Sequence, residues 1–158
     1  GKGGGLDTKK TYENFILEFE WKISEKGNSG VKYRMKQIGK KKLGLEYQVI
    51  DDRGAKGAAK AYHKAGSIYD LVPAAPDKPL HPPGQWNRGR IVAKGPVIEH
   101  WLNGAKVAEI DQSTADWKTR FAKSKYKAAE GFGSGPGVLH LQDHGNEVWF
   151  RNIRVKAL

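Results

Sequence analysis

The chain of 158 residues contains no cysteine. Disulfide bonds and metal sites built on thiolates are therefore excluded, although this absence does not identify a cellular compartment. No apolar run reaches the roughly 20 residues that a membrane-spanning helix needs. No signal peptide is visible either, but a secreted protein after cleavage would look the same. The length is sufficient for one domain with a hydrophobic core.

Acidic residues are few, with 17 Asp and Glu against 28 Lys and Arg, and the net charge is +11. The basic residues are spread along the whole chain and no nucleic-acid-binding motif occurs, so a nucleic acid is not an expected partner. A solvated, lysine-rich surface is the simplest interpretation. Binding of an anionic glycan is a weaker alternative, and it would depend strongly on salt.

Long helical patterns are also scarce, whereas alternation of apolar and polar residues recurs throughout the chain. This period of two is typical of strands with one buried face, and it is clearest at 15–23. Further strands are predicted at 31–35, 45–49, 67–72, 86–94, 97–102, 105–110, 137–142 and 148–155.

The segments between these strands carry turn and loop signals. Asn103-Gly104 predicts a tight type I′ hairpin turn. A basic loop is expected at 36–42, and further loops at 53–64 and at the proline-rich segment 73–83. One short helix is expected at 113–123, capped by Ser113 or Thr114. Together these features predict an all-β fold, a two-sheet antiparallel β-sandwich with one short helix.

The C-terminal stretch 137–155 reads GVLHLQDHGNEVWFRNIRV and predicts a hairpin or two neighbouring strands. Such a pairing would place His140, Gln142, His144 and Arg151 near one polar surface. A sheet needs only one apolar face, so a second face that carries these side chains indicates a site.

Several longer motifs carry a family resemblance. They are LDTKKTYENFILEFEWKI, GNSGVKYR, EYQVIDD, QWNRGRIV, EHWLNG and LQDHGNEVWFRNI. Together they resemble the 3-keto-disaccharide hydrolase family over residues 6–158. The resemblance implies one concanavalin A-like (LamG-like) jelly-roll domain over 1–158. Family members usually begin some tens of residues earlier, so the chain is expected to lack an N-terminal segment of the full family domain. The resemblance also implies a periplasmic or extracellular location in bacteria.

The resemblance further implies cleavage of glycosides whose glucose is oxidised at carbon 3. The 3-keto group acidifies the proton on carbon 2, so a base can remove that proton and the aglycone on carbon 1 can leave by elimination. Water can then add back. This reaction needs a base, a group that stabilises the enolate oxygen and an acid for the leaving oxygen.

The candidate base is His144 or Glu46, with Arg34 and Gln142 holding hydroxyls or the enolate. The full set of expected substrate-binding residues is Arg34, Gln48, Asp51, His100, His140, Gln142 and Arg151. Structural alternatives stay open for several of these side chains. His144 fits a turn, Glu46 could pair with Arg34 across neighbouring strands, and His100 shares its spacing with apolar residues, which favours a core histidine.

A divalent metal ion is a possible cofactor, acting as a Lewis acid on the substrate oxygens. Glu46, Asp51, His140 and His144 supply suitable ligand types, but no tight ligand spacing occurs. The main alternative to an enzyme is a lectin-like carbohydrate-binding module, because the same fold serves both functions. The sequence makes no prediction of oligomeric state.

Overall fold

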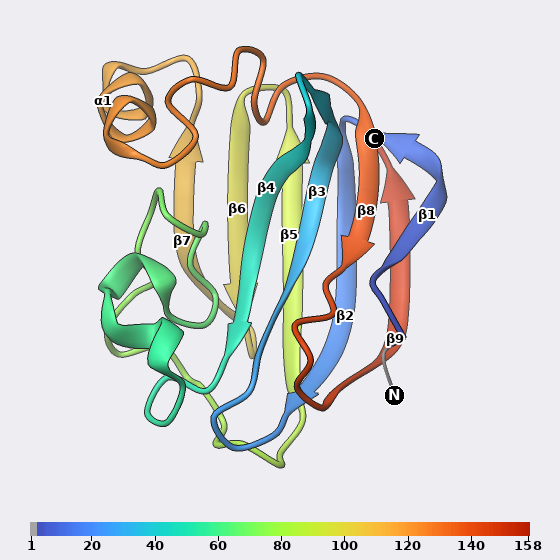
Figure 1. The fold of residues 1–158 in the computed structure, drawn as a ribbon, viewed down its shortest axis with the longest axis vertical. Helices are drawn as coiled ribbons and strands as arrows, with labels where there is room; N and C mark the ends of the chain where they lie inside the picture. Colours follow the sequence, from blue (N-terminus) through green and yellow to red (C-terminus); the bar gives the residue numbers. More distant parts are fainter. Residues whose placement is uncertain (1–2) are drawn as a thin grey trace.

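The computed structural model describes residues 3–158 as two antiparallel sheets packed face to face (Figure 1). The four-stranded sheet has the order β1-β8-β3-β4, and the five-stranded sheet has the order β7-β6-β5-β2-β9. The strands are β1 (Leu6–Tyr12), β2 (Phe15–Ile23), β3 (Asn28–Ile38), β4 (Lys41–Ile50), β5 (Asn87–Lys94), β6 (Val97–Leu102), β7 (Ala105–Asp111), β8 (Gly137–Leu141) and β9 (Val148–Ala157). The predicted two-sheet sandwich is therefore confirmed.

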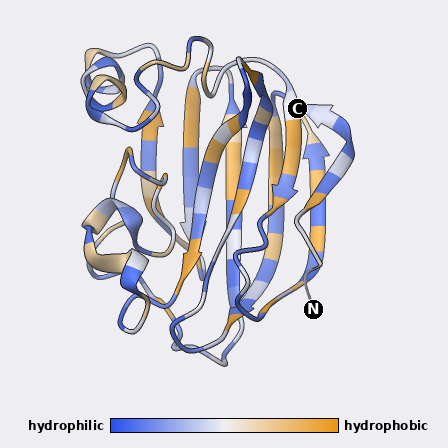
Figure 2. Cartoon of the chain, in the orientation of Figure 1, coloured by the Kyte–Doolittle hydropathy of each residue, from blue (hydrophilic) through white to orange (hydrophobic). Residues whose placement is uncertain are grey.

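The core lies between the two sheets and is built by the period-two alternation. On β2, Phe15, Leu17 and Trp21 are buried, while the residues between them are more exposed. Tyr33 and Tyr47 face them from the other sheet, and the ring of Tyr33 meets that of Phe15 edge to face at 5.9 Å. The same alternation appears along the strands in Figure 2 as bands of hydrophilic and hydrophobic residues. Burial of each large apolar side chain contributes about 1.5–3 kcal/mol.

The local signals at the turns and the helix are confirmed. Asn103 and Gly104 both have positive φ, at 47° and 89°, as a type I′ turn requires between β6 and β7. The helix α1 covers Ala115–Lys123, and the Thr114 side chain caps it by accepting a hydrogen bond from the Trp117 N–H at 3.3 Å. Among the described residues, no helix combines the length and the apolar character that crossing a membrane requires.

The predicted pairing of the two C-terminal strands is wrong. β8 pairs with β1 and β3, whereas β9 pairs with β2 at the edge of the other sheet. The turn at 143–146 therefore connects the two sheets and does not close a hairpin. Periodicity identifies a strand and its buried face, but the hydrogen-bonding partner depends on chain segments far away in the sequence.

Three further expectations differ from the structure. Residues 36–42 are not a loop, because β3 and β4 continue through them to a tight turn at Gly39, where φ is 56°. The segment 67–72 forms only isolated bridges, although residues 66–69 hydrogen-bond along the free edge of β4. β1 was not predicted from alternation because its exposed sequence, LDTKKTY, carries little apolar signal. The loop at 53–64 contains the short 3₁₀ helices η1 (Lys56–Ala59) and η2 (Ala61–His63).

Candidate active site

The outer face of the four-stranded sheet carries a row of polar side chains that crosses every strand. Lys32 on β3 is opposite Glu46 on β4 and His140 on β8, and His140 is in turn opposite Asp7 on β1. At the free edge of β4, the Tyr69 N–H donates to the Glu46 carbonyl at 3.0 Å. These residues alternate with core residues along their strands and therefore share the outer face.

The carboxyl group of Glu46 is the central group of this row. It is buried, with 5% of the residue exposed, and its Oε2 lies 3.8 Å from the Lys32 Nζ. The carboxamide of Gln142 is assigned so that its NH₂ donates to Glu46 Oε1 at 3.2 Å and its oxygen accepts from Lys32 Nζ at 3.3 Å. The carboxyl also lies over Gly30, where any Cβ would overlap Glu46 Oε1. We call Glu46, Lys32 and Gln142 the Glu46 cluster.

Burial dominates the electrostatics of the cluster. It raises the pKa of Glu46, because the charged carboxylate loses hydration, and the positive charges of Lys32 and Lys125 only partly oppose this rise. Burial also lowers the pKa of Lys125, against the opposing effect of the negative charges of Glu46 and Asp70. Burial thus disfavours the charged forms of both the Glu46 carboxyl and the Lys125 ammonium, and ionisable groups with perturbed pKa values are typical of acid–base sites.

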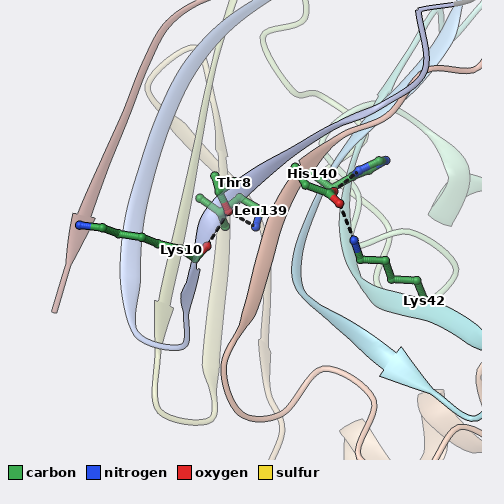
Figure 3. A network of polar contacts seen from close by, with 6 residues as sticks. Thr8, Lys10, Lys42, Leu139 and His140 are labelled. Carbon is green, nitrogen blue, oxygen red and sulfur yellow. Dashed lines mark hydrogen bonds and ion pairs between the residues drawn. The ribbon is translucent and has the colours of Figure 1, made fainter.

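At the other end of the row, Asp7 connects Lys42 and His140 (Figure 3). Its Oδ1 lies 2.7 Å from His140 Nδ1, and its Oδ2 forms an ion pair with Lys42. Hydrogen bonds from Lys42 and then from His140 lower the pKa of Asp7. The carboxylate orients the imidazole, while the opposite edge of the ring lies against Gly5, where a Cβ would be 2.7 Å from Nε2. Thr8 links the same strands, accepting from Leu139 N and donating to Lys10 O (Figure 3).

The structure thus brings together Glu46, His140 and Gln142 of the predicted set. Gln48 follows on the same face of β4, but it is buried and its Nε2 donates to Asn28 Oδ1 at 2.8 Å. Asp51 lies beyond the end of β4, in a cleft of about 730 Å³ that is distinct from the Glu46 cluster. Burial opposes its ionisation, but N–H bonds from Lys26, Arg53 and Gly54 outweigh that effect and lower the pKa of Asp51.

Arg34 does not lie beside Glu46, and this prediction is wrong. A register shift follows Tyr33, and Arg34 itself has a φ of 46°, so the alternation along β3 is broken there. The guanidinium is buried and donates to the carbonyls of Glu13 at 2.9 Å, Gly95 at 2.8 Å and Gly133 at 3.2 Å. The residue that pairs with Glu46 across the strands is Lys32, and Arg34 instead ties loops together at one end of the sandwich.

His100 is a core histidine. It is fully buried between the sheets, its Nδ1 donates to the Gly66 carbonyl at 3.0 Å, and its Nε2 accepts from the Tyr33 hydroxyl at 2.8 Å. The carbonyl can only accept, which assigns the tautomer. Burial lowers the pKa of His100 to about 4. The residue therefore stays neutral at physiological pH and is out of reach of a substrate in solution.

The remaining two candidates also lie apart from the row. His144 is an exposed residue of the connection between the sheets. Arg151 lies on β9 in the five-stranded sheet, where its Nε donates to Glu20 Oε2 at 2.6 Å and its guanidinium covers the Trp86 ring at 3.9 Å. The expectation that His140 and Arg151 share one polar surface is wrong, because β8 and β9 belong to different sheets.

Sequence reasoning missed Lys32, Tyr69 and Lys125. Lys32 lies two residues after Gly30 and therefore on the same, polar face of the strand. This alternation could have identified Lys32 from the sequence. Tyr69 and Lys125 offered none, because one lies in an irregular segment and the other follows the helix. Only the folded chain brings them to Glu46.

A divalent metal ion does not fit the described residues. Residues 3–158 contain no group of three or more His, Cys, Asp or Glu side chains that could hold one. Of the four ligand residues proposed from the sequence, Glu46 faces Lys32 and His140 is hydrogen-bonded to Asp7. Asp51 lies in the separate cleft, and His144 is exposed on the connection after β8. No step is therefore assigned to a metal.

Comparison with known proteins identifies the family. Residues 1–156 match the model of the 3-keto-alpha-glucoside-1,2-lyase-like domain. The chain belongs to this family. It is 34% identical over 184 aligned positions to a 3-keto-disaccharide hydrolase of Bacteroides thetaiotaomicron, and the alignment covers all of this chain and 63% of that protein. The chain thus spans less than two thirds of the length of this relative.

Solved structures agree with the jelly-roll fold. A proposed glycosyl hydrolase from Parabacteroides distasonis superposes with a TM-score of 0.89 at 35% identity, covering 98% of this chain and 76% of that one. The carbohydrate-binding module CBM66 from Bacillus subtilis superposes with a TM-score of 0.59 at 12% identity, covering 99% of this chain and 84% of that one. The second likeness is one of fold alone.

Proposed function

We propose that this domain cleaves 3-keto-glucosides or 3-keto-disaccharides, with Glu46 as the base that removes the proton on carbon 2. The observation that carries the proposal is the state of Glu46, a buried carboxyl with a raised pKa beside the Lys32 ammonium group. The family membership and the named activity of the Bacteroides relative support the same substrate class.

The proposed reaction proceeds in two stages. The Glu46 carboxylate takes the carbon-2 proton, the electron pair forms the double bond between carbons 1 and 2, and the bond from carbon 1 to the glycosidic oxygen breaks. The leaving oxygen takes up a proton and the aglycone is released. Water then adds across the double bond, with hydroxyl on carbon 1 and hydrogen on carbon 2, and 3-keto-glucose results. The keto oxygen carries negative charge during the first stage, which a nearby ammonium stabilises.

Each group of the cluster has a part in this proposal. Lys32 lies on the outer face beside Glu46 and can stabilise the enolate oxygen. Gln142 holds the Glu46 carboxyl in place and contacts Lys32 at the same time. His140, oriented by Asp7, is the nearest imidazole along the row, and it is the candidate for hydrogen bonds to substrate hydroxyls.

The test is aglycone release from a 3-keto aryl glucoside, measured next to the ordinary aryl glucoside. Release is expected only from the 3-keto substrate. Glu46→Gln keeps the size of the side chain and removes the base, so kcat/KM should fall by about 10²–10⁴-fold. Glu130→Gln, at an exposed position, is the matched control and should retain activity. A parallel reaction with EDTA tests the divalent ion.

Two results would overturn the proposal. One is the absence of release from either substrate by the folded chain. The other is a Glu46→Gln variant that retains activity within about threefold of the original, far less than a general base contributes. Binding of the sugar without release would assign the domain to the carbohydrate-binding class.

The binding-module alternative has one observation in its favour, the tryptophans on the outer face of the five-stranded sheet. Trp149 is 40% exposed. However, Lys22 Nζ lies 4.3 Å from the centre of its ring, and the Arg151 guanidinium lies 3.9 Å from the centre of the Trp86 ring. These cations already occupy ring faces on which a sugar would stack, so the structure favours the enzyme.

A further inference from the structure

Tyr69 continues the polar row of the four-stranded sheet beyond its last strand. Tyr47 on β4 forms a bridge with Ile68, and the Tyr69 N–H donates to the Glu46 carbonyl at 3.0 Å, so Tyr69 is opposite Glu46. Ile68 is fully buried, and because side chains alternate along an extended segment, Tyr69 lies on the outer face. Glu46 thus has Tyr69 on one side and Lys32 on the other. The order along the whole row is Tyr69, Glu46, Lys32, His140 and Asp7.

The ring of Tyr69 is held in place by its neighbours. The His63 ring stacks on it, with 4.5 Å between the ring centres and an angle of 18° between the ring planes. His63 is itself fixed, because its Nε2 lies 3.0 Å from Asp70 Oδ1. The other oxygen of Asp70 accepts a hydrogen bond from the Lys125 backbone N–H at 2.8 Å, and the Lys125 Nζ lies 4.1 Å from the centre of the Tyr69 ring. These contacts restrain the phenol beside Glu46 before any substrate binds.

The Tyr69 hydroxyl is available to a substrate. Among residues 3–158, the tyrosine hydroxyls that hydrogen-bond within the protein are those of Tyr33 and Tyr47, and the side chain of Tyr69 is partly exposed. Burial, followed by the negative charges of Glu46 and Asp70, raises the pKa of Tyr69. The hydroxyl therefore keeps its proton at physiological pH and has it ready to donate.

The order of the side chains matches the order of the reacting atoms in the substrate. In the proposed reaction Glu46 takes the proton on carbon 2, and Lys32 stabilises the enolate oxygen on carbon 3. The leaving oxygen is bonded to carbon 1, which flanks carbon 2 on its other side. Directly opposite residues of an antiparallel pair have Cβ atoms about 4.5–5.5 Å apart, a spacing that the substituents of one sugar ring can bridge. A sugar with carbon 2 at Glu46 and carbon 3 toward Lys32 therefore places the leaving oxygen toward Tyr69.

We propose that Tyr69 is the general acid of this site, whose hydroxyl donates its proton to the glycosidic oxygen as the bond from carbon 1 breaks. The inference rests on the proposed function and assigns the proton donor that the elimination needs. The Lys125 ammonium group at the ring stabilises the phenolate that results. In the second stage Tyr69 takes a proton from the water whose hydroxyl adds to carbon 1, and Glu46 returns its proton to carbon 2. Both groups thus regain their initial protonation states.

The experiment compares Tyr69→Phe with the original chain on 3-keto glucosides that differ in their leaving group. Phenylalanine keeps the ring and its stacking on His63 and removes only the hydroxyl. The series runs from 4-nitrophenyl, which leaves as a stable anion, through phenyl to methyl, whose oxygen needs a proton in order to leave. Tyr12→Phe is the matched control, because Tyr12 is a partly buried tyrosine that packs on Phe15, at the opposite end of β1 from Asp7. The value of kcat/KM is measured for each protein with each substrate.

In Tyr69→Phe, kcat/KM should fall by about 10²–10⁴-fold for the methyl glucoside and stay within about threefold for the 4-nitrophenyl glucoside, because only the poor leaving group depends on an acid. The activity retained on the second substrate also shows that the variant is folded. Tyr12→Phe should match the original chain across the series. An equal loss for every leaving group, or no loss for any of them, would overturn the inference and leave the proposed function standing. If the original chain released no aglycone from any 3-keto substrate, the proposed function itself would fail, and the inference with it.

Discussion

Replacing Arg34 by methionine should lower the free energy of unfolding of the domain by about 3–5 kcal/mol. We expect this loss because Arg34 stabilises the fold and does not bind the substrate. The guanidinium donates four hydrogen bonds, three to backbone carbonyls and one to Gln112 Oε1 at 3.0 Å. Each bond to a charged group is worth about 1.5–3 kcal/mol. Burial of the charge has its own cost, which the variant recovers, and this offsets part of the loss.

Urea unfolding at pH 7 measures this loss directly, and thermal unfolding should show a Tm lower by about 6–20 °C. Arg154→Met, at an exposed position on β9, is the control and should change stability by less than about 0.5 kcal/mol. If Arg34→Met retained its stability within about 1 kcal/mol but lost affinity for the sugar, the structural assignment of Arg34 would be refuted. Arg34 would then return to the substrate-binding set.

Two further perturbations test the core histidine His100 and the Glu46 carboxyl that lies over Gly30. The ordinary pKa of histidine is 6.5 and that of His100 is about 4, so between these pH values only the unfolded chain takes up a proton. The free energy of unfolding should therefore fall as the pH drops from 6.5 to 4, by up to about 3 kcal/mol. Urea unfolding of His100→Gln should lack this part of the pH dependence. An equal dependence on pH in the two proteins would contradict the assignment of His100 as a buried neutral histidine. Gly30→Ala adds a methyl group that overlaps Glu46 Oε1, so it should cost about 1–3 kcal/mol of stability and most of the activity on the 3-keto substrate. Full activity in a folded Gly30→Ala variant would show that Glu46 can move without consequence.

Features that depend on neighbouring residues could be predicted well. The alternation in 15–23 identified β2 and its buried face, because a strand points successive side chains to opposite sides. The Asn103-Gly104 turn and the Thr114 cap were found for similar reasons, since each needs only a few consecutive residues to form. The shared face of Glu46 and Gln48 follows from the same spacing.

The sequence by itself therefore determined the strands, their buried faces, the type I′ turn, the helix cap and, through its motifs, the family. The tertiary structure alone decided which strands meet. It assigned β8 and β9 to different sheets, and the register of β3 against β4 placed Lys32, not Arg34, opposite Glu46. It also brought Tyr69 to the edge of β4 beside Glu46 from a segment 23 residues further along the chain. Alternation is a local consequence of backbone geometry, whereas pairing and register are settled by hydrogen bonds and packing between distant segments, which no local pattern records.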